Sequence, residues 1–391
     1  MKLILKLLAG IVGGILLGLF APSVLIALLL TFKGVFGQLL FFTIPLLILF
    51  FITSGIAGLP RNSGQMLGRT LATAYTSTVL AGILAFLVAA AIVPLLAGDG
   101  ASVNATAGEV PEPLLVLEIP PLMGIMSALT AAFIFGLGIA AARADQLKTV
   151  FDQGRDVIEK LLVVVIIPLL PFYIAGVFAE LAAAGTVFET LKTFGVILAL
   201  SIGLHWVWIS TLFLIAGMRA GASPLGLVRN MLPAYFTALG TMSSAATIPV
   251  TLQSVRNNGV REDVSAFTVP LCATTHLAGS TITIVACAVA VMVLHDALAV
   301  PSLLGMLPFI FMLGLVMLAA PGVPGGAVMS AVALLTSMLG FGESAIALMI
   351  ALYMAQDSFG TACNVTGDGA IAVLVDQAAE PAVDPATPTE S

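Results

Sequence analysis

The chain is built mainly from long, uninterrupted runs of apolar residues, each long enough to cross a lipid bilayer. A helix needs about 20 such residues to span the hydrocarbon core. In the first half of the chain, we predict spans over residues 3–21, 35–59, about 70–97, about 122–142, about 161–184 and about 193–217. The segment from Gly98 to Pro121 is polar, acidic and proline-bearing, which predicts an extramembrane loop between the third and fourth spans.

Beyond Arg219 the pattern changes, because two apolar stretches are each interrupted near the middle. Residues 224–256 are broken by Thr241-Met-Ser-Ser-Ala-Ala-Thr-Ile-Pro249, and residues 302–340 by Pro321-Gly-Val-Pro-Gly-Gly326. Each stretch is long enough for two half-spans joined by a tip, which predicts two re-entrant helical hairpins. Irregular backbone at this depth is tolerated only where protein or a water-filled cavity surrounds it.

Two further spans complete the pattern. Residues 262–299 form a long apolar segment with an unusual middle, Cys272-Ala-Thr-Thr-His-Leu-Ala-Gly-Ser280, and residues 342–375 form the last span. The tail from Gln377, residues 377–391, is rich in Ala, Pro and acidic residues and is predicted to be disordered. All of these elements are helical, so the sequence predicts an all-α integral membrane protein.

The basic residues test the direction in which the chain is threaded. If the N-terminus is cytoplasmic, 12 of the 14 basic residues fall inside, and only Lys33 and Lys192 fall outside. This asymmetry follows the positive-inside rule. Arg229 and Arg256 flank the first hairpin, so it enters from the cytoplasm, whereas the second enters from outside. Two oppositely oriented broken segments indicate an inverted-repeat transporter with a site near the midplane.

Composition supports the membrane assignment and excludes other classes. The chain is 60% hydrophobic and 9% charged, with a mean hydropathy of +1.16, whereas soluble proteins are roughly 25% charged. The net charge of −6 argues against a nucleic-acid partner, which requires a basic face. Three cysteines in apolar segments provide neither a disulfide framework nor a metal-ligand spacing. The first run follows Lys2 and Lys6 but lacks a cleavage site, so it is read as a span and not as a signal peptide.

The last span carries a stripe of polar residues. Asp357, Thr361, Asn364 and Asp368 stand at offsets of 0, 4, 7 and 11, which places them on one helix face. Carboxylates inside a membrane are costly, and this indicates a functional site. The alternative is a polar seam between helices, although such a seam does not need two carboxylates.

Glycines beside these carboxylates suggest a cation site. Gly360, Gly367 and Gly369 would allow the helix to unwind locally and offer carbonyl oxygens. A carboxylate together with carbonyl oxygens is a hard-cation site of the sodium type. At the first hairpin tip, Ser243 and Ser244 with free helix-end amides suit an anionic carboxylate. The second tip is a backbone surface that could hinge, or alternatively a plain turn.

Four of these segments together resemble one known family. They are 241–251, 269–279, 322–326 and 356–368, and in this order they resemble the dicarboxylate/amino acid:cation symporters, which include the glutamate transporters. The resemblance implies eight transmembrane helices plus two re-entrant hairpins, inverted repeats, a homotrimer and an elevator mechanism. It divides residues 1–220 into scaffold spans 1, 2, 4 and 5 together with core spans 3 and 6. It assigns residues 221–376 to the transport core. The expected location is the bacterial inner membrane, with both termini cytoplasmic.

The resemblance also implies roles for individual residues. The substrate amino group would bind Asp357, while Asn364 and the Ser243-Ser244 tip would take the α-carboxylate, with Thr361 beside them. Asp368 with Asn364 would form one sodium site. The remaining implied residues are Gly360, Ser280, Val323 and Gly325 around the substrate, and Cys272, Thr274 and Ala320 at a second sodium site.

Departures from the family pattern bear on the substrate. Acidic-substrate members carry an arginine at the position of Gly360, and some relatives carry one at Met242; no Lys or Arg follows Arg261 in this chain. An unpaired buried carboxylate would cost several kcal/mol. We therefore expect aspartate and glutamate to be poor substrates. The motifs are most similar to the sodium/serine-threonine symporter branch, so serine, threonine or alanine is predicted.

Other departures bear on coupling. A further sodium site of the family uses an aspartate where this chain has Ala278 and an asparagine where it has His276. Fewer sodium ions per cycle are expected, because a hard cation needs charge or many oxygens. His276 is alternatively a proton site, which would make the protein proton-coupled, and an exchange-only transporter remains a further alternative.

An intramembrane aspartyl protease is disfavoured because Asp357 and Asp368 lie about 16 Å apart on one helix. A channel is disfavoured because the sequence contains no charge ring or filter repeat.

Overall fold

The protein is described by a computed structural model covering residues 2–58, 64–97, 110–295 and 297–378. Within these residues the regular elements are all helices, as predicted. Helices satisfy their own backbone hydrogen bonds, which is what the bilayer interior requires. The helices, in order, are α1 (Lys2–Phe20), α2 (Ser23–Ala57), α3 (Gly64–Ala97), α4 (Ile125–Ala142), α5 (Asp145–Leu161), a π-helical turn η1 (Leu162–Ile166), α6 (Ile167–Ala183), α7 (Val187–Ala220), α8 (Pro224–Thr241), α9 (Ser244–Asn257), α10 (Glu262–Thr275), α11 (Ala278–Leu294), α12 (Leu303–Met317), α13 (Gly326–Leu339) and α14 (Glu343–Ala378).

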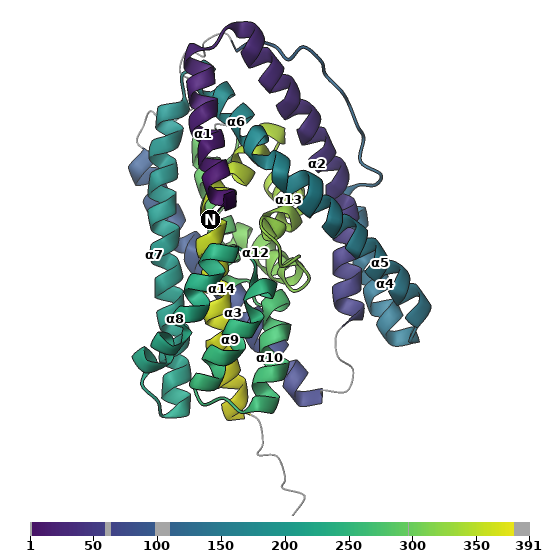
Figure 1. Cartoon of the computed structure of the whole chain (residues 1–391), viewed down its shortest axis with the longest axis vertical. Helices are drawn as coiled ribbons and strands as arrows, with labels where there is room; N and C mark the ends of the chain where they lie inside the picture. The colour runs from purple at the N-terminus through teal and green to yellow at the C-terminus, as the bar shows by residue number, and fades with distance from the viewer. Residues whose placement is uncertain (1, 59–63, 98–109, 296, 379–391) are drawn as a thin grey trace, which may run out of the picture.

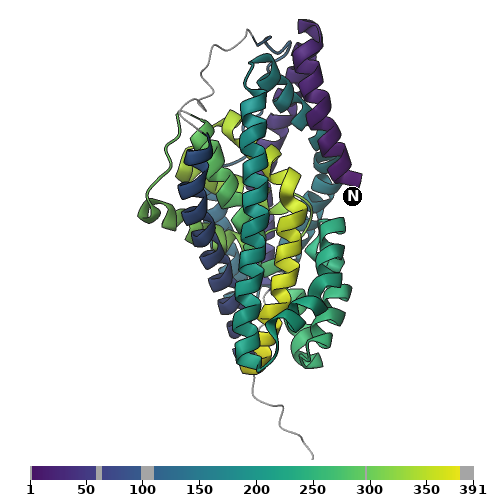
Figure 2. The same cartoon turned by 90° about the vertical axis from the view of Figure 1, so that its left-hand side faces the viewer.

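The helices form two packed groups. In one group α2 packs against α4, α5 and α6, and α1 packs along α6. In the other, α14 runs through the centre in contact with α7, α8, α10 and α11, while α3 covers α11 and α12 (Figure 1). Figure 2 shows α7 lying alongside α14 from the other direction. The buried polar stripe therefore lies in the second group, away from lipid.

Within the described residues, six helical segments are long and apolar enough to cross a membrane: Ser23–Ala57, Gln65–Leu95, Asp145–Ala183, Thr190–Ala220, Glu262–Leu294 and Glu343–Ala378. The predicted spans 3–21 and about 122–142 correspond to α1 and α4, which are helical but shorter apolar segments. The multi-pass architecture is thus confirmed, while the count of eight spans stays a prediction.

Two helices begin earlier than the predicted spans, because charged residues lie within the helices. The second helix begins at Ser23 and not at residue 35, so Lys33, which was expected outside the membrane, lies within α2. Its ammonium lies 2.5 Å from the Glu180 carboxylate on α6, and this pairing offsets the cost of placing a charge in an apolar helix. The fifth span similarly begins at Asp145, because the amphipathic α5 continues through η1 into α6.

Both interrupted stretches form the predicted helical hairpins, α8–α9 and α12–α13. The unusual middle of 262–299 is a break at His276-Leu277 between α10 and α11. The last span differs, because α14 is continuously helical through Gly360, Gly367 and Gly369, so the expected local unwinding is absent. Helix hydrogen bonds therefore occupy the carbonyls that were expected to face a cation.

Both predicted irregular segments are only partly described. Residues 110–121 are non-helical, as expected for the loop, and the N–H of Leu114 donates to the Thr31 hydroxyl. Residues 98–109 lie outside the described part, as do residues 379–391 of the predicted tail. Gln377 and Ala378 belong to α14, so the tail begins later than predicted.

Close packing of α1 on α6 depends on glycines spaced four residues apart. A Cβ at Gly14 would lie 2.3 Å from the Ala175 carbonyl oxygen, and Gly10 and Gly18 approach α6 equally closely, whereas a Cβ at Gly13 would meet nothing within 4 Å. Small residues at this spacing let helix backbones meet in a membrane.

We expect Gly14→Val to lower the free energy of unfolding by about 1–3 kcal/mol through overpacking, measured as a lower Tm in detergent. Gly13→Val is the matched control, and an equal Tm for both variants would contradict this packing role.

Candidate functional site

The polar stripe of α14 faces a small cavity between the two hairpin tips, lined mainly by buried residues. Its volume is about 20 Å³, which is room for about one water molecule. Six of the nine predicted substrate residues line it: Ser244, Ser280, Val323, Asp357, Thr361 and Asn364. The other lining residues are Met242, Leu277, Pro321, Gly322, Ala327 and Tyr353. The remaining three predicted residues do not line the cavity. Ser243 and Gly325 form hydrogen bonds to the lining residues Gly322 and Asp357, and Gly360 lies against Gly279 and Thr283 of α11.

Asp357 is held by the backbone of the second hairpin. The N–H of Gly325 donates to its Oδ2 at 2.8 Å, and the side chain is 3% exposed. Gly325 begins α13 with a φ of +75°, and a Cβ there would lie 2.8 Å from the Met354 sulfur, so glycine is required. No Lys or Arg lines the cavity. The carboxylate is therefore poised to pair with a cationic group supplied by a ligand.

Asn364 is committed to holding the start of α11. Its Oδ1 accepts the N–H groups of Gly279 at 2.7 Å and Ser280 at 3.2 Å, and its Nδ2 donates to the Ser280 hydroxyl at 2.9 Å. The two helices meet closely here, because a Cβ at Gly279 would lie 2.4 Å from the Gly360 carbonyl oxygen. One N–H of the Asn364 amide is left for a ligand in addition to these contacts.

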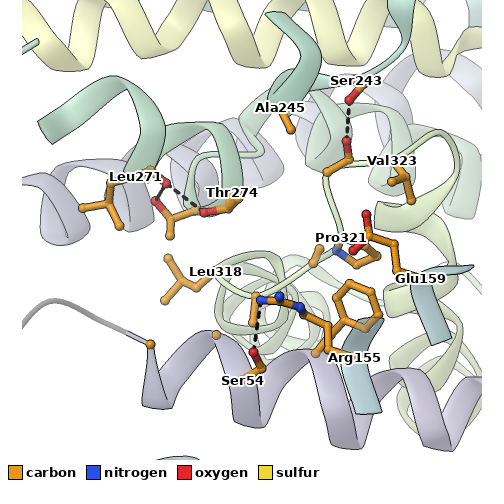
Figure 3. Close-up of a pocket in the computed structure, with 17 residues that line it drawn as sticks. Ser54, Arg155, Glu159, Ser243, Ala245, Leu271, Thr274, Leu318, Pro321 and Val323 are labelled. Atoms are coloured by element: carbon orange, nitrogen blue, oxygen red, sulfur yellow. Dashed lines mark hydrogen bonds between the residues drawn. The ribbon is translucent and has the colours of Figure 1, made fainter. Parts of the chain in front are cut away.

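A direct hydrogen bond joins the two hairpin tips. The Ser243 hydroxyl donates to the Gly322 carbonyl at 2.8 Å and also accepts the N–H of Ala246 as the N-cap of α9. On the far side of the tips lies a second cavity of about 420 Å³ (Figure 3). Its opposite wall carries Arg155 and Glu159 of α5.

The tips are the wall between the two cavities. Pro321, Gly322 and Val323 line both of them. A solute in the larger cavity would therefore reach Asp357 once this segment moved. The larger cavity has room for a small amino acid, whereas the smaller one does not.

Asp368 lies in a separate buried cluster. Its Oδ1 is 2.9 Å from His276 Nδ1, and His276 Nε2 is 2.9 Å from the Ser77 hydroxyl, which also accepts the Trp208 indole N–H at 3.2 Å. His276 and Asp368 are 0% and 1% exposed. The predicted sodium ligand is thus occupied by an imidazole in this structure. Ala278, one turn away, offers no side-chain oxygen.

The residues predicted for a second sodium site are only partly brought together. Thr274 and Ala320 line the larger cavity, where the Thr274 hydroxyl donates to the Leu271 carbonyl at 3.1 Å (Figure 3). Cys272 is fully buried elsewhere, and its carbonyl accepts the N–H of His276 at 2.9 Å.

Sequence reasoning missed Tyr353. It stands four residues before Asp357 and therefore extends the polar stripe by one turn, which was the available signal. Leu277 and Ala327 were also missed, and apolar lining residues of this kind give no signal in a chain that is apolar throughout.

Comparison with known proteins agrees with this architecture. The model of the Sodium:dicarboxylate symporter family matches residues 3–378. The chain is 32% identical over 299 residues to the serine/threonine transporter SstT of Streptococcus suis (strain 05ZYH33). This match covers 73% of this chain and 81% of that protein. It is 28% identical over 281 residues to excitatory amino acid transporter 1 of Bos taurus and 27% identical to that of Homo sapiens, each match covering 66% of this chain and 49% of the relative. The chain thus matches about half the length of these mammalian relatives. It belongs to the sodium:dicarboxylate symporter family.

Proposed function

We propose that this protein carries a small neutral amino acid across the bacterial inner membrane by sodium-coupled symport. The observation that carries this proposal is the buried Asp357 carboxylate, which faces a small cavity between two hairpin tips with no Lys or Arg in its lining. A zwitterionic amino acid provides the missing cation as its α-ammonium. Its α-carboxylate would meet Ser243, Ser244 and the free N–H of Asn364.

The transport cycle follows from the wall that separates the two cavities. Moving the segment Pro321–Val323 would open the small cavity to the larger one, after breaking the bond between Ser243 and Gly322. Beyond this gate, we propose an elevator in which the core of residues 221–376 slides against a scaffold made of spans 1, 2, 4 and 5. The proposal includes eight spans, inverted repeats, a homotrimer and cytoplasmic termini.

Sodium binding is proposed with fewer ions than in acidic-substrate relatives. Thr274 and Ala320, with the Cys272 carbonyl, are the candidate ligands for one ion. Asp368 is the candidate for another only if His276 moves away. The contact between His276 and Asp368 favours a second candidate function, in which His276 carries a proton and the protein is a proton-coupled or exchange-only transporter.

The function is tested by uptake of labelled serine into proteoliposomes. An inward sodium gradient at equal pH is expected to drive accumulation, whereas a proton gradient without sodium is not. Accumulation under the proton gradient alone would favour the second candidate. Absence of serine, threonine and alanine uptake under both gradients would overturn the proposed substrate class.

Aspartate provides the specificity test in the same assay. We expect aspartate uptake to be at least about 100-fold slower than serine uptake, because its second carboxylate would be buried without a cationic partner at a cost of several kcal/mol. Equal initial rates for aspartate and serine would contradict the neutral-substrate assignment.

A further inference from the structure

Tyr353 contributes a buried hydroxyl that no described residue satisfies with a hydrogen bond of good geometry. Its side chain is 0% exposed and borders the cavity that contains Asp357. The hydroxyl lies close to both Asp357 and Ser280, but makes no hydrogen bond of good geometry with either. A buried polar group without a partner typically costs about 1–3 kcal/mol. Groups of this kind call for a specific explanation, such as a missing ligand.

Two other polar side chains that line the cavity already have protein partners. Asp357 Oδ2 accepts the Gly325 N–H, and Asn364 is joined to Ser280. Ser244 lies at the first hairpin tip, where the proposed substrate carboxylate would bind. Gly360 has no side chain, and a Cβ there would lie 3.3 Å from the Thr283 hydroxyl, so that part of the helix face presents only backbone.

A bound amino acid has three groups to place. Its ammonium would pair with Asp357, and its carboxylate with the tip donors and Asn364. The side chain is then the group that remains near Tyr353, which lies on the same face of α14 as Asp357. A phenol both donates and accepts hydrogen bonds without a charge, so it is suited to a neutral hydroxyl and offers nothing to a methyl group.

We propose that Tyr353 is the specificity-determining residue that selects amino acids with a side-chain hydroxyl. This inference rests on the proposed function and narrows it to serine and threonine over alanine. A site built to hydrogen-bond a substrate hydroxyl discriminates strongly against an analogue that lacks it, because the buried partner is then left unpaired. Loss of the Tyr353 hydroxyl removes the hydrogen bond that only a hydroxylated substrate can make, so serine uptake slows and discrimination falls.

The test compares serine with 2-aminobutyrate, in which a methyl group replaces the hydroxyl. In proteoliposomes containing the wild-type protein, we expect kcat/KM for serine to exceed that for 2-aminobutyrate by at least about tenfold. In Tyr353→Phe the ratio is expected to fall close to one, mainly through slower serine uptake. Alanine uptake is measured alongside and is expected to change by less than about threefold.

Each other outcome counts against the proposal. A wild-type ratio near one overturns it without any variant, so misfolding of Tyr353→Phe cannot rescue it. Equal loss of serine, alanine and 2-aminobutyrate uptake in a Tyr353→Phe protein with a wild-type elution profile would assign Tyr353 to positioning Asp357 instead. Failure of the wild-type protein to transport any of the three amino acids would overturn the proposed function itself.

Discussion

Asp357→Asn is expected to abolish serine binding while leaving the protein folded. The amide keeps the shape of the side chain and can still accept the Gly325 N–H, but it cannot pair with an ammonium group. Removing one partner of a buried charge pair costs about 3–5 kcal/mol. Serine affinity should therefore fall by about 10²-fold to 4 × 10³-fold. Equilibrium binding of labelled serine to purified protein measures this directly.

The Tm of the variant distinguishes loss of serine binding from misfolding. The empty wild-type protein buries a carboxylate with no cationic side chain beside it, so Asp357→Asn should have an equal or higher Tm without substrate. Asp376→Asn is the matched control, because Asp376 lies on the same helix but pairs with Arg261 at 2.7 Å, away from the cavity. Serine affinity within about threefold of wild type in Asp357→Asn would remove this residue from the substrate site.

Much of the fold could be predicted because membrane spans and broken segments leave local signals. The interruptions at 241–249 and 321–326 fall where the hairpin tips are, and the offsets from Asp357 to Asn364 place both residues at one cavity. The predicted span starts differ from the helix starts where a charged residue lies within a helix. Lys33 looked like the end of a loop, since its partner Glu180 is 147 residues away and cannot be read from local sequence.

The pairing of Asp368 was also beyond local sequence reasoning. The stripe placed Asp368 correctly on the face of α14, but its chemistry depends on the residue that faces it across the helix packing. That residue is His276, 92 positions earlier, at the break between α10 and α11. The spacing of polar residues along the helix is the same whether free carbonyls or an imidazole surround the carboxylate. Only tertiary contact distinguishes them.

His276→Asn is expected to increase the dependence of serine uptake on sodium. The imidazole now occupies the Asp368 Oδ1, and a shorter side chain with an amide oxygen would release that carboxylate and add a second oxygen ligand. Hard cations such as sodium prefer oxygen ligands. The variant should therefore bind about one more sodium ion per cycle, which appears as a steeper dependence of initial uptake rate on sodium concentration.

The sodium-to-serine flux ratio gives the decisive measurement. Labelled sodium and serine uptake into the same proteoliposomes should show the ratio rising by about one ion in His276→Asn, since each bound cation is carried with the substrate. His295→Asn is the matched control, because His295 lies at the end of α11 beside Ser344, away from both carboxylates of α14. If the ratio and the sodium dependence match wild type, Asp368 is not a latent sodium ligand. In that case its contact with His276 is a structural bond between α14 and the broken helix.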